Sequence, residues 1–352
     1  GFTRGRSIST NLSCFMAQAV PAVVGRSNLD AVYCDMSKAF DVVNHSLLLA
    51  KLVLSDVDTC IVTLIRSYPQ DRYCYVSVNG QTSFRYKTTS GVPQGSVLGP
   101  LLFSIFINDV ACAIKNSSFL LYADDIKIFK EVRNIRDCTS LQADVMSFHR
   151  WCTRNHLILN PSKTKVVSYT LKTQQLLYSY KIESTALPRV TEIRDLGVLF
   201  DSSLTFSAHV THISRRSLRC LGAVCRYSRE FRGPPPFLKL YSALCLPLLE
   251  YGSIVWNGTC KSNSDRIERV QNKFISIFKY RFRHVQTDEN GGLSLLQSFP
   301  TLRCRRMRAD IIFLYKVIHG YILCDDLATL VNVNVPKKIV RTYHSFRPGA
   351  LH

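Results

Sequence analysis

The pattern of apolar and polar positions predicts alternating strands and helices before residue 206, and mainly helices after it. Residues 31–35 form an apolar run that ends in a carboxylate, which predicts a short buried strand. Longer periodic runs predict helices near 46–54, 58–67 and 135–155. Asp41, Asn44 and His45 precede the first of these helices, and we expect them to serve local hydrogen bonding and its start. Glycine and proline break the later helical pattern at 233–236 and 291–292.

Two hairpins are predicted from their turns. Asn79-Gly80 is typical of a tight two-residue turn. Asp124 and Asp125 lie between two apolar runs, so a tight connection would hold both carboxylates at the edge of a sheet. Carboxylates about 4 Å apart repel by roughly 4 kcal/mol at an effective dielectric near 20, so a fixed pair favours a cation between them, and oxygen ligands favour Mg²⁺ or Mn²⁺. The alternative is a solvated acidic turn.

Two further segments add candidate chemistry. Asp35 ends its apolar run at the place where a site on an open sheet would be built. Gly91, Gly95 and Gly99 lie in a loop before the apolar run 101–107, which predicts a buried helix. Such a loop suits a surface that touches a flat partner such as a base pair, although an ordinary glycine-rich connection is the alternative.

The order of these segments resembles motifs A, B and C of reverse transcriptases. Asp35 with Phe40 matches motif A, residues 91–96 match motif B, and residues 122–125 match motif C. In detail the chain resembles the reverse transcriptase of insect-type, LINE-like non-LTR retrotransposons. Almost the whole chain is covered, because further segments match in the family's order: residues 1–7 before motif A, motif D at 159–164, the primer grip at 196–198 and 204–206, and the thumb and the region after it at 240–256 and 267–271.

The resemblance implies an α+β fold, the right-hand polymerase palm. In that fold an antiparallel sheet is backed by helices, with partial fingers and a mainly helical thumb and C-terminal region. We expect a remnant of the fingers at 1–30, the palm with the primer grip at 31–205, and the thumb and C-terminal region at 206–352. Basic residues that grip the triphosphate in the family would precede residue 1. We therefore expect a fragment that lacks the N-terminal part of the fingers and an upstream endonuclease domain.

The resemblance also implies an activity, RNA-directed DNA polymerisation from dNTP onto a primer 3′-hydroxyl, with an RNA template and a DNA primer as partners. Asp35, Asp124 and Asp125 would hold two Mg²⁺ ions, with Mn²⁺ as the alternative. Lys163 resembles the motif D lysine that protonates the leaving pyrophosphate. Lys165 is its rival, because both lysines would project from the same face of one strand.

Five other residues acquire binding roles from the resemblance. Phe40 looks like the aromatic gate beneath the incoming sugar, and a core aromatic is the alternative. Gln94 and Gly95 would lie against the nascent base pair. Leu196 and Gly197 belong to the segment that resembles the primer grip.

Composition agrees with a nucleic-acid partner. The net charge is +20, and residues 206–319 hold 19 Lys or Arg against 7 Asp or Glu. Arg215, Arg219 and Arg226 recur at helical spacing on the expected thumb, and further arginines cluster at 303–308. We expect them to follow the backbone of a template–primer duplex. A solvated basic face is the alternative.

Cysteine usage and hydropathy predict an intracellular protein, in the nucleus or the cytoplasm. The 13 cysteines are scattered without a Cys-x-x-Cys pair, which suits a reducing compartment. Cys152 with His156, and His209 with His212, have loose ligand-like spacing, but no complementary pair stands nearby, so a zinc site is not expected. The sequence shows no convincing secretory signal and no apolar span of about 18 residues, so we expect no membrane partner, and no cofactor beyond the metal.

One other function stays open, and a third is disfavoured. A non-catalytic nucleic-acid-binding remnant of such an element would keep the fold and lose turnover; the expected lack of fingers favours it, and the retained carboxylates favour the polymerase. An RNA-dependent RNA polymerase is disfavoured, because Phe40 would obstruct a ribonucleotide. Tyr122 and Ala123, rather than glycine, also precede the motif C carboxylates.

Overall fold

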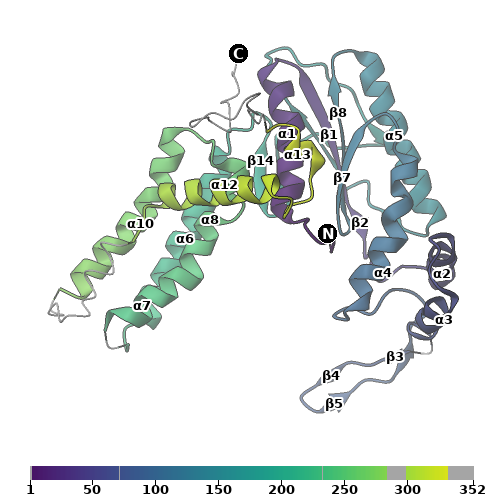
Figure 1. The fold of residues 1–352 in the computed structure, drawn as a ribbon, viewed down its shortest axis with the longest axis horizontal. Coiled ribbons are helices and arrows are strands. Elements are labelled where there is room, and N and C mark those ends of the chain that lie inside the picture. Colours follow the sequence, from purple (N-terminus) through teal and green to yellow (C-terminus); the bar gives the residue numbers. More distant parts are fainter. Residues whose placement is uncertain (1, 71, 232, 284–298, 332–352) are drawn as a thin grey trace, which may run out of the picture. The chain divides into compact units, whose positions relative to one another are not determined.

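The computed structural model describes residues 2–70, 72–231, 233–283 and 299–331 (Figure 1). The chain forms two compact units, the first from residues 1–6 and 21–191 and the second from residues 7–20 and 192–352. The domain boundaries expected at residues 30 and 205 stay predictions. Within the described ranges, no helix combines the length and the apolar character that crossing a bilayer requires.

An antiparallel sheet of four strands organises the first unit, in the order β10–β1–β8–β7. Its strands are β1 (Asn28–Cys34), β7 (Ser118–Tyr122), β8 (Asp125–Val132) and β10 (Lys165–Tyr169). The two central strands, β1 and β8, are buried at most positions, which matches their content of β-branched and aromatic residues. The expected α+β palm, a sheet backed by helices, is confirmed.

Helices and short strand pairs complete the first unit. Its helices are α2 (His45–Leu54), α3 (Thr59–Ser67), α4 (Leu98–Ile107), the 3-10 helix η1 (Asn108–Ala113) and α5 (Ile135–Arg154). Helix α1 (Ile8–Val24) belongs to the second unit up to residue 20 and to the first unit from residue 21. The short pairs are β2 (Met36–Ser37) with β9 (Ile158–Leu159), β3 (Tyr73–Cys74) with β6 (Tyr86–Lys87), β4 (Ser77–Val78) with β5 (Gln81–Thr82), and β11 (Lys181–Ile182) with β12 (Thr185–Ala186).

Local signals placed several of these elements correctly. Helices α2, α3 and α5 lie where the periodicity predicted them, and the side chain of Asn44 caps α2 by accepting the N–H of Leu47 at 3.0 Å. Asn79 and Gly80 both have positive φ, at 50° and 80°, so the expected tight turn between β4 and β5 is confirmed. The break expected at 291–292 lies outside the described residues.

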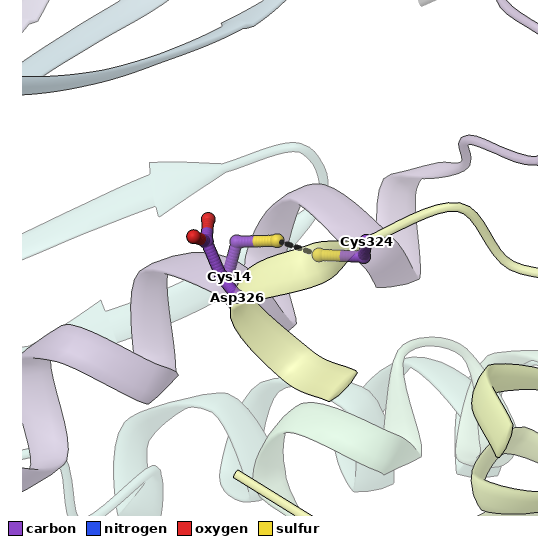
Figure 2. A group of neighbouring side chains, drawn as sticks. All are labelled: Cys14, Cys324 and Asp326. Carbon is purple, nitrogen blue, oxygen red and sulfur yellow. Dashed lines mark hydrogen bonds between the residues drawn. The ribbon is translucent and has the colours of Figure 1, made fainter. Parts of the chain in front are cut away.

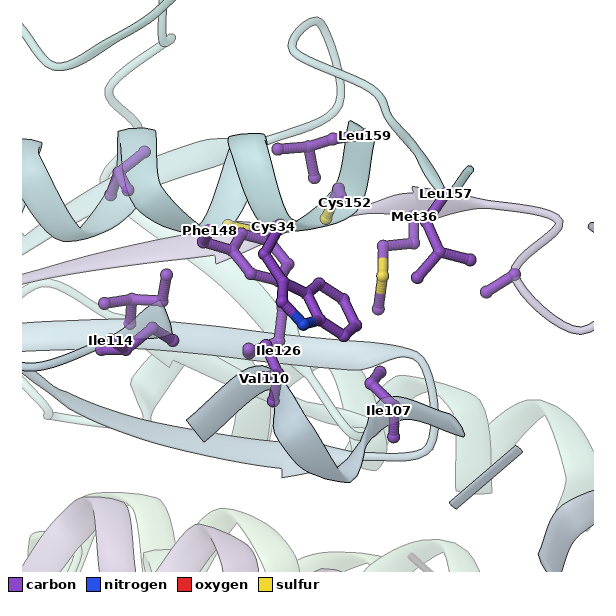
Figure 3. Packing of buried hydrophobic residues seen from close by; sticks show 14 of the residues in the cluster. Cys34, Met36, Ile107, Val110, Ile114, Ile126, Phe148, Cys152, Leu157 and Leu159 are labelled. Atoms are coloured by element: carbon purple, nitrogen blue, oxygen red, sulfur yellow. The ribbon is translucent and has the colours of Figure 1, made fainter. Parts of the chain in front are cut away.

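The core of the first unit lies between the central strands and the helices that cover them (Figure 3). Phe148 and Cys152 of α5 are fully buried beside Cys34 of β1 and Ile126 of β8. Burial raises the pKa of the Cys152 thiol to about 12, so this sulfur acts as a small apolar group. Cys34 and Ile126 are therefore anchored inside the core at the ends of their strands.

A buried carboxylate joins β1 to β10 and to the segment after it. Asp30 is fully buried and accepts hydrogen bonds from Ser168 Oγ at 2.5 Å and Tyr180 Oη at 2.7 Å. Arg189 Nη1 lies 3.7 Å from the Asp30 carboxylate and compensates its charge. Burial and the Asp30 charge raise the pKa of Tyr180, which keeps this hydroxyl a donor. A buried charge with one partner removed is costly, so this group holds the end of the sheet together.

The second unit is mainly helical. It contains the hairpin β13 (Glu192–Asp195) and β14 (Val198–Asp201), followed by α6 (Ser207–Tyr227), α7 (Pro234–Leu240), the π-helix η2 (Tyr241–Cys245), α8 (Leu246–Glu250), α9 (Ser253–Trp256), α10 (Lys261–Arg281), α12 (Leu302–Ile318) and α13 (Asp325–Ala328). Aromatic rings fill its core, and those of Tyr241 and Phe274 stack with centroids 3.7 Å apart.

Two arginines of the 303–308 cluster are used inside this unit. Arg306 is 1% exposed and donates to Asn257 Oδ1 and Ser264 Oγ, both at 2.9 Å. Arg305 forms an ion pair with Glu250. The expectation that this cluster follows a nucleic-acid backbone is therefore wrong for Arg306, whose guanidinium is enclosed by the fold.

Burial of His209 makes the stability of the second unit sensitive to acid. His209 is 2% exposed, and its Nδ1 accepts the N–H of Leu199 at 3.2 Å. Burial, with smaller effects from His212 and Arg194, lowers its pKa from 6.5 to about 4. The unfolded chain binds this proton more tightly, so the stabilisation is complete above pH 6.5 and is lost as the pH falls towards 4.

We predict that His209→Asn, which keeps an acceptor for Leu199, flattens this dependence. Between pH 7 and pH 4.5 the wild type should lose about 2 to 3 kcal/mol more unfolding free energy than the variant. Urea unfolding at the two pH values measures the difference, and His319→Asn, at an exposed position, should keep the wild-type slope. An identical slope for His209→Asn would contradict the assignment.

Candidate active site

A two-residue turn holds the motif C carboxylates at the end of the central hairpin. Strands β7 and β8 are joined by Ala123 and Asp124, and Tyr122 pairs with Asp125 across the turn. Ala123 has φ of 55°, and a positive φ costs a residue with a Cβ about 1 kcal/mol or more. A positive φ at the first central residue alone is the pattern of a type II′ turn. The expected hairpin is confirmed, and its backbone is strained at the residue before Asp124.

The register of the sheet brings the motif A carboxylate beside this turn. Cys34 pairs with Ile126, so one further step sets Asp35 beside Asp125 on neighbouring strands. Such strands lie about 4.7 to 4.9 Å apart. Cys34 and Ile126 point into the core (Figure 3), so the residues next to them emerge on the opposite face. Two carboxylates from segments ninety residues apart in sequence therefore meet at one edge of the palm sheet.

The donor set at this edge suits a hard divalent cation. Asp35, Asp124 and Asp125 offer only carboxylate oxygens, the ligands that Mg²⁺ prefers, and none of the three is buried. Among the described residues, only Cys14, Cys324 and Asp326 place three potential metal-ligand atoms within 4.8 Å of one another. The carboxylate oxygens of Asp35, Asp124 and Asp125 are therefore farther apart than 4.8 Å in at least one pair. The three carboxylates repel one another when no cation is bound, and a bound cation would offset this repulsion and allow them to approach more closely.

Lys163 lies beside Asp35, but on a turn. The side chain of Asn160 accepts the N–H groups of Ser162 and Lys163, and strand β10 begins only at Lys165. The expectation that Lys163 and Lys165 share a strand face is therefore wrong, because an Asn-based turn replaces the strand at Lys163. Lys163 Nζ lies 3.8 Å from Asp35 Oδ2, whereas Lys165 pairs with Tyr33 in the sheet. The structure thus separates two lysines that spacing could not.

Backbone hydrogen bonds fasten the motif B loop to the segment after Asp35. Gly91 N donates to Val43 O at 2.8 Å, and Val92 N donates to Phe40 O at 2.9 Å. Gly91 has φ of 89°, and a Cβ there would lie 2.6 Å from the carbonyl oxygen of Asp41. Only glycine permits this approach, so motifs A and B form one continuous surface.

Comparison with known proteins agrees with this arrangement. The family model described as "Reverse transcriptase (RNA-dependent DNA polymerase)" matches residues 2–222. The chain belongs to the reverse transcriptase family. Two relatives from Drosophila melanogaster are the "Probable RNA-directed DNA polymerase from transposon X-element", 31% identical over 78% of this chain, and that "from transposon BS", 29% identical over 78%.

The reverse transcriptase described here spans about a third of the length of these curated relatives, since the aligned part covers 31% of each. The expected likeness to enzymes of non-LTR retrotransposons is confirmed, with further matches to the mobile element jockey at 27% identity. A solved telomerase structure from Candida tropicalis is 13% identical with a TM-score of 0.42, over 79% of this chain and 42% of that one. That likeness is weak, and the fold rests on the sheet described above.

Phe40, Gln94 and Gly95 lie on the surface formed by motifs A and B of this reverse transcriptase. Phe40 is half-buried, and its ring stacks on Phe103 with centroids 4.1 Å apart. Gln94 is exposed and its Nε2 donates to Asp41 Oδ1 at 2.6 Å, which fixes the side chain. Gly95 is exposed, with φ of 76° and open space where a Cβ would lie. The Phe40 side chain is therefore covered in part by its contact with Phe103 and remains accessible in part.

In the second unit, the segment that resembles the primer grip is the turn of the β13–β14 hairpin. Leu196 and Gly197 have φ of 44° and 88°, the pattern of a type I′ turn. Tyr251 Oη donates to Leu196 O at 2.8 Å, and a Cβ on Gly197 would lie 2.9 Å from the Tyr251 ring. Tyr251 therefore supports the turn, a role that the sequence did not indicate.

Basic residues gather on two neighbouring helices of the second unit. Arg215, Arg219 and Arg226 are exposed on α6, and the last two follow Arg215 by four and eleven residues, which keeps all three on one face. A cavity of 450 Å³ lies between α6 and α10, where α10 adds Arg266, Arg269 and Lys273. These three were not predicted from the sequence, although their spacing of three and four residues marks one helical face.

One further group of potential ligands was not foreseen. Cys14 and Cys324 are buried with their sulfur atoms 2.7 Å apart, and Asp326 lies beside them (Figure 2). Two thiolates that bind one tetrahedral zinc ion at about 2.3 Å would have their sulfur atoms about 1 Å farther apart than Cys14 and Cys324 do, so this geometry does not fit a zinc ion. The two side chains instead pack α1 against the segment before α13.

We predict that Gly91→Ala destabilises the first unit more than Gly95→Ala. Both positions have positive φ, so each substitution should cost about 1 kcal/mol in backbone strain. The new Cβ at 91 also meets the Asp41 carbonyl, which should raise its total cost to about 2 to 4 kcal/mol. Urea unfolding of the two variants measures the difference. Equal costs would show that the two motifs are not in close contact.

Proposed function

We propose that this chain transfers deoxynucleotides from dNTP to the 3′-hydroxyl of a DNA primer, directed by an RNA template. The observation that carries the proposal is the register of β1 with β8, which sets Asp35 beside Asp125 and the turn that contains Asp124. Membership of the reverse transcriptase family supports the reaction, as do the names of the Drosophila relatives. No disulfide joins the thirteen cysteines, all of which lie within the described ranges, and this supports a place inside the cell, in the nucleus or the cytoplasm.

In this proposal three aspartates are the metal ligands. Reverse transcriptases generally use divalent metal ions, and Asp35, Asp124 and Asp125 would hold two Mg²⁺ ions here, with Mn²⁺ as the alternative. The ions would supply positive charge that lowers the pKa of the primer hydroxyl and neutralises the triphosphate. The chain itself contributes position, because sheet pairing fixes one carboxylate and a tight turn fixes the others.

Lys163 would act as the acid that protonates the leaving pyrophosphate. Its ammonium lies 3.8 Å from the Asp35 carboxylate, on an exposed turn, and a triphosphate bound to metal ions at Asp35 would lie beside it. Asn160 fixes that turn through hydrogen bonds to the backbone. A positioned acid of this kind contributes about 10²- to 10⁴-fold to a rate.

The remaining surface would bind the substrates. Phe40 would lie beneath the incoming sugar and exclude a 2′-hydroxyl, and Gln94 and Gly95 would contact the nascent base pair. Leu196 and Gly197 would hold the primer. These roles follow from the family resemblance, and the exposure of Gln94 and Gly95 supports them.

The basic face of α6 would bind the phosphates of the template–primer duplex. Arg215, Arg219 and Arg226 support this by their exposure on one side of the helix. The residues that α10 contributes to the neighbouring cavity would extend the same face. Such binding weakens steeply as salt rises, because each phosphate contact releases counterions.

Primer extension tests the proposed reaction. With an RNA template, a DNA primer, dNTP and Mg²⁺, the wild type should extend the primer, and Asp124→Asn should lower the rate at least about 100-fold. Asp58→Asn is the matched control, because Asp58 only caps α3 and asparagine caps as well. Tight binding of the duplex without extension by the wild type would overturn the proposal in favour of a non-catalytic nucleic-acid-binding protein.

The two lysines allow a matched test of the acid. Lys163→Ala should slow single-turnover incorporation by about 10² to 10⁴ without a change in primer–template affinity, whereas Lys165→Ala should be near wild type. Equal and silent effects at both positions would remove the role.

Sugar selectivity tests Phe40. Phe40→Ala should lower the preference for dNTP over rNTP by about 10- to 100-fold, because the ring would no longer occupy the space of the 2′-hydroxyl. Phe40→Tyr, which keeps the ring, should retain the preference. Relative values of kcat/KM for the two nucleotides measure the effect, and unchanged selectivity in Phe40→Ala would assign the residue to packing on Phe103 alone.

A further inference from the structure

A two-stranded ribbon between motifs A and B exposes an unusual set of aromatic side chains. The pairs β3–β6 and β4–β5 form this ribbon, which extends beyond α3 in Figure 1. Tyr73, Tyr75 and Tyr86 are 52 to 59% exposed, and Phe84 is 86% exposed. A two-stranded hairpin gains little stability by itself, so aromatic rings on both strands without cover indicate a binding surface.

A bulge arranges these rings. Cys74 pairs with Tyr86, but nearer the turn Ser83 N donates to Val76 O, so the single residue Tyr75 faces two residues, Phe84 and Arg85. Bulges of this kind turn a strand and re-aim its side chains. The guanidinium of Arg85 lies 5.8 Å from the Tyr75 ring centroid, a cation–π contact across the ribbon.

The charge of the ribbon has one sign. Residues 72–90 contain Arg72, Arg85 and Lys87 and no aspartate or glutamate. Register places Tyr73 opposite Lys87, and alternation puts Tyr75 and Arg85 on that same face. Flat rings interleaved with cations on one exposed face have the chemistry of a single-stranded nucleic-acid platform.

The ribbon also continues into the active-site surface. A cavity of 660 Å³ is lined by Arg72, Tyr86 and Lys87 on the ribbon side, and by Asp41 and Gln94 of motifs A and B on the other. Tyr86 belongs to the face opposite Tyr73 and Tyr75, but Lys87 lies opposite Tyr73 and also lines the cavity, so a strand on the ring-bearing face would reach the loop that contains Gly91 past Lys87. This continuity favours a nucleic acid over a protein partner.

We propose that this ribbon binds an unpaired strand of nucleic acid, with bases stacked on Tyr73 and Tyr75 and phosphates bound by Arg85 and Lys87. Unpaired bases are needed because a duplex hides their faces from such rings. This inference deepens the proposed function. It rests on that function only for the identity of the strand, which would be the part of the RNA template that has not yet been copied. Binding itself requires no turnover.

Fluorescence anisotropy tests the proposal with labelled oligo(U) RNA and oligo(dT) DNA of about 12 nucleotides, a length within the range that such sites cover. The measurement uses EDTA and about 0.15 M salt, which weakens binding through phosphates alone. The double variant Tyr73→Leu/Tyr75→Leu should bind at least about 10-fold more weakly than the wild type, and Tyr73→Phe/Tyr75→Phe should bind equally well. Tighter binding of one oligonucleotide would identify the preferred strand.

Two control variants show whether a loss of binding is specific to the rings of the ribbon. One removes an exposed ring elsewhere, and the other removes a proposed catalytic carboxylate. Tyr321→Leu removes a ring that is 65% exposed outside the ribbon and should bind like the wild type. Arg85→Gln/Lys87→Gln should reduce the slope of log affinity against log salt by about 1.4, as expected for two phosphate contacts on a single strand. Asp124→Asn should bind normally, so that loss of polymerisation and loss of ribbon binding can be told apart.

The proposal is overturned if the leucine pair binds both oligonucleotides as tightly as the wild type. It is also overturned if the leucine pair instead abolishes self-association of the protein in sedimentation without nucleic acid. That second outcome would show the ribbon to be an interface between copies of this chain.

Discussion

The antiparallel pairing of β1 with β8 is the constraint on which the active site depends. Side chains alternate between the two faces of a strand, so the register that buries Cys34 and Ile126 also fixes where Asp35 and Asp125 emerge. A slip of one residue by β1 would turn Asp35 into the core and expose Cys34, and a slip by β8 would do the same to Asp125 and Ile126. The hydrophobic core beneath the sheet thus sets the position of charged groups that it never contacts.

Backbone hydrogen bonds then gather the other motifs around this strand end. The motif B loop is bound to the segment after Asp35 through main-chain groups, and Asn160 N in motif D donates to Asp35 O at 3.0 Å. Because main-chain atoms make these connections, the side chains of Gln94 and Lys163 remain at the surface. Such a frame supplies position, which is most of what a polymerase contributes to phosphoryl transfer.

The sequence predicted what local chemistry decides. The Asn79-Gly80 turn, the principal helices of the first unit and the carboxylates at strand ends all carry their signals within a few neighbouring residues. Lys163 was misplaced because the side chain of Asn160 favours a turn over a strand. Arg306 was misread because its partners lie more than forty residues away, and no spacing rule reports burial of that kind.

The most direct test of the account is to locate the metal ions. Crystals of the chain with a primed RNA template, a non-hydrolysable dNTP analogue and Mn²⁺ would give anomalous difference maps at the manganese edge. The account predicts two peaks about 3.5 to 4 Å apart, bound by Asp35 and Asp124. Manganese found only at other sites, with the Asp35 and Asp124 carboxylates apart and unliganded, would contradict it.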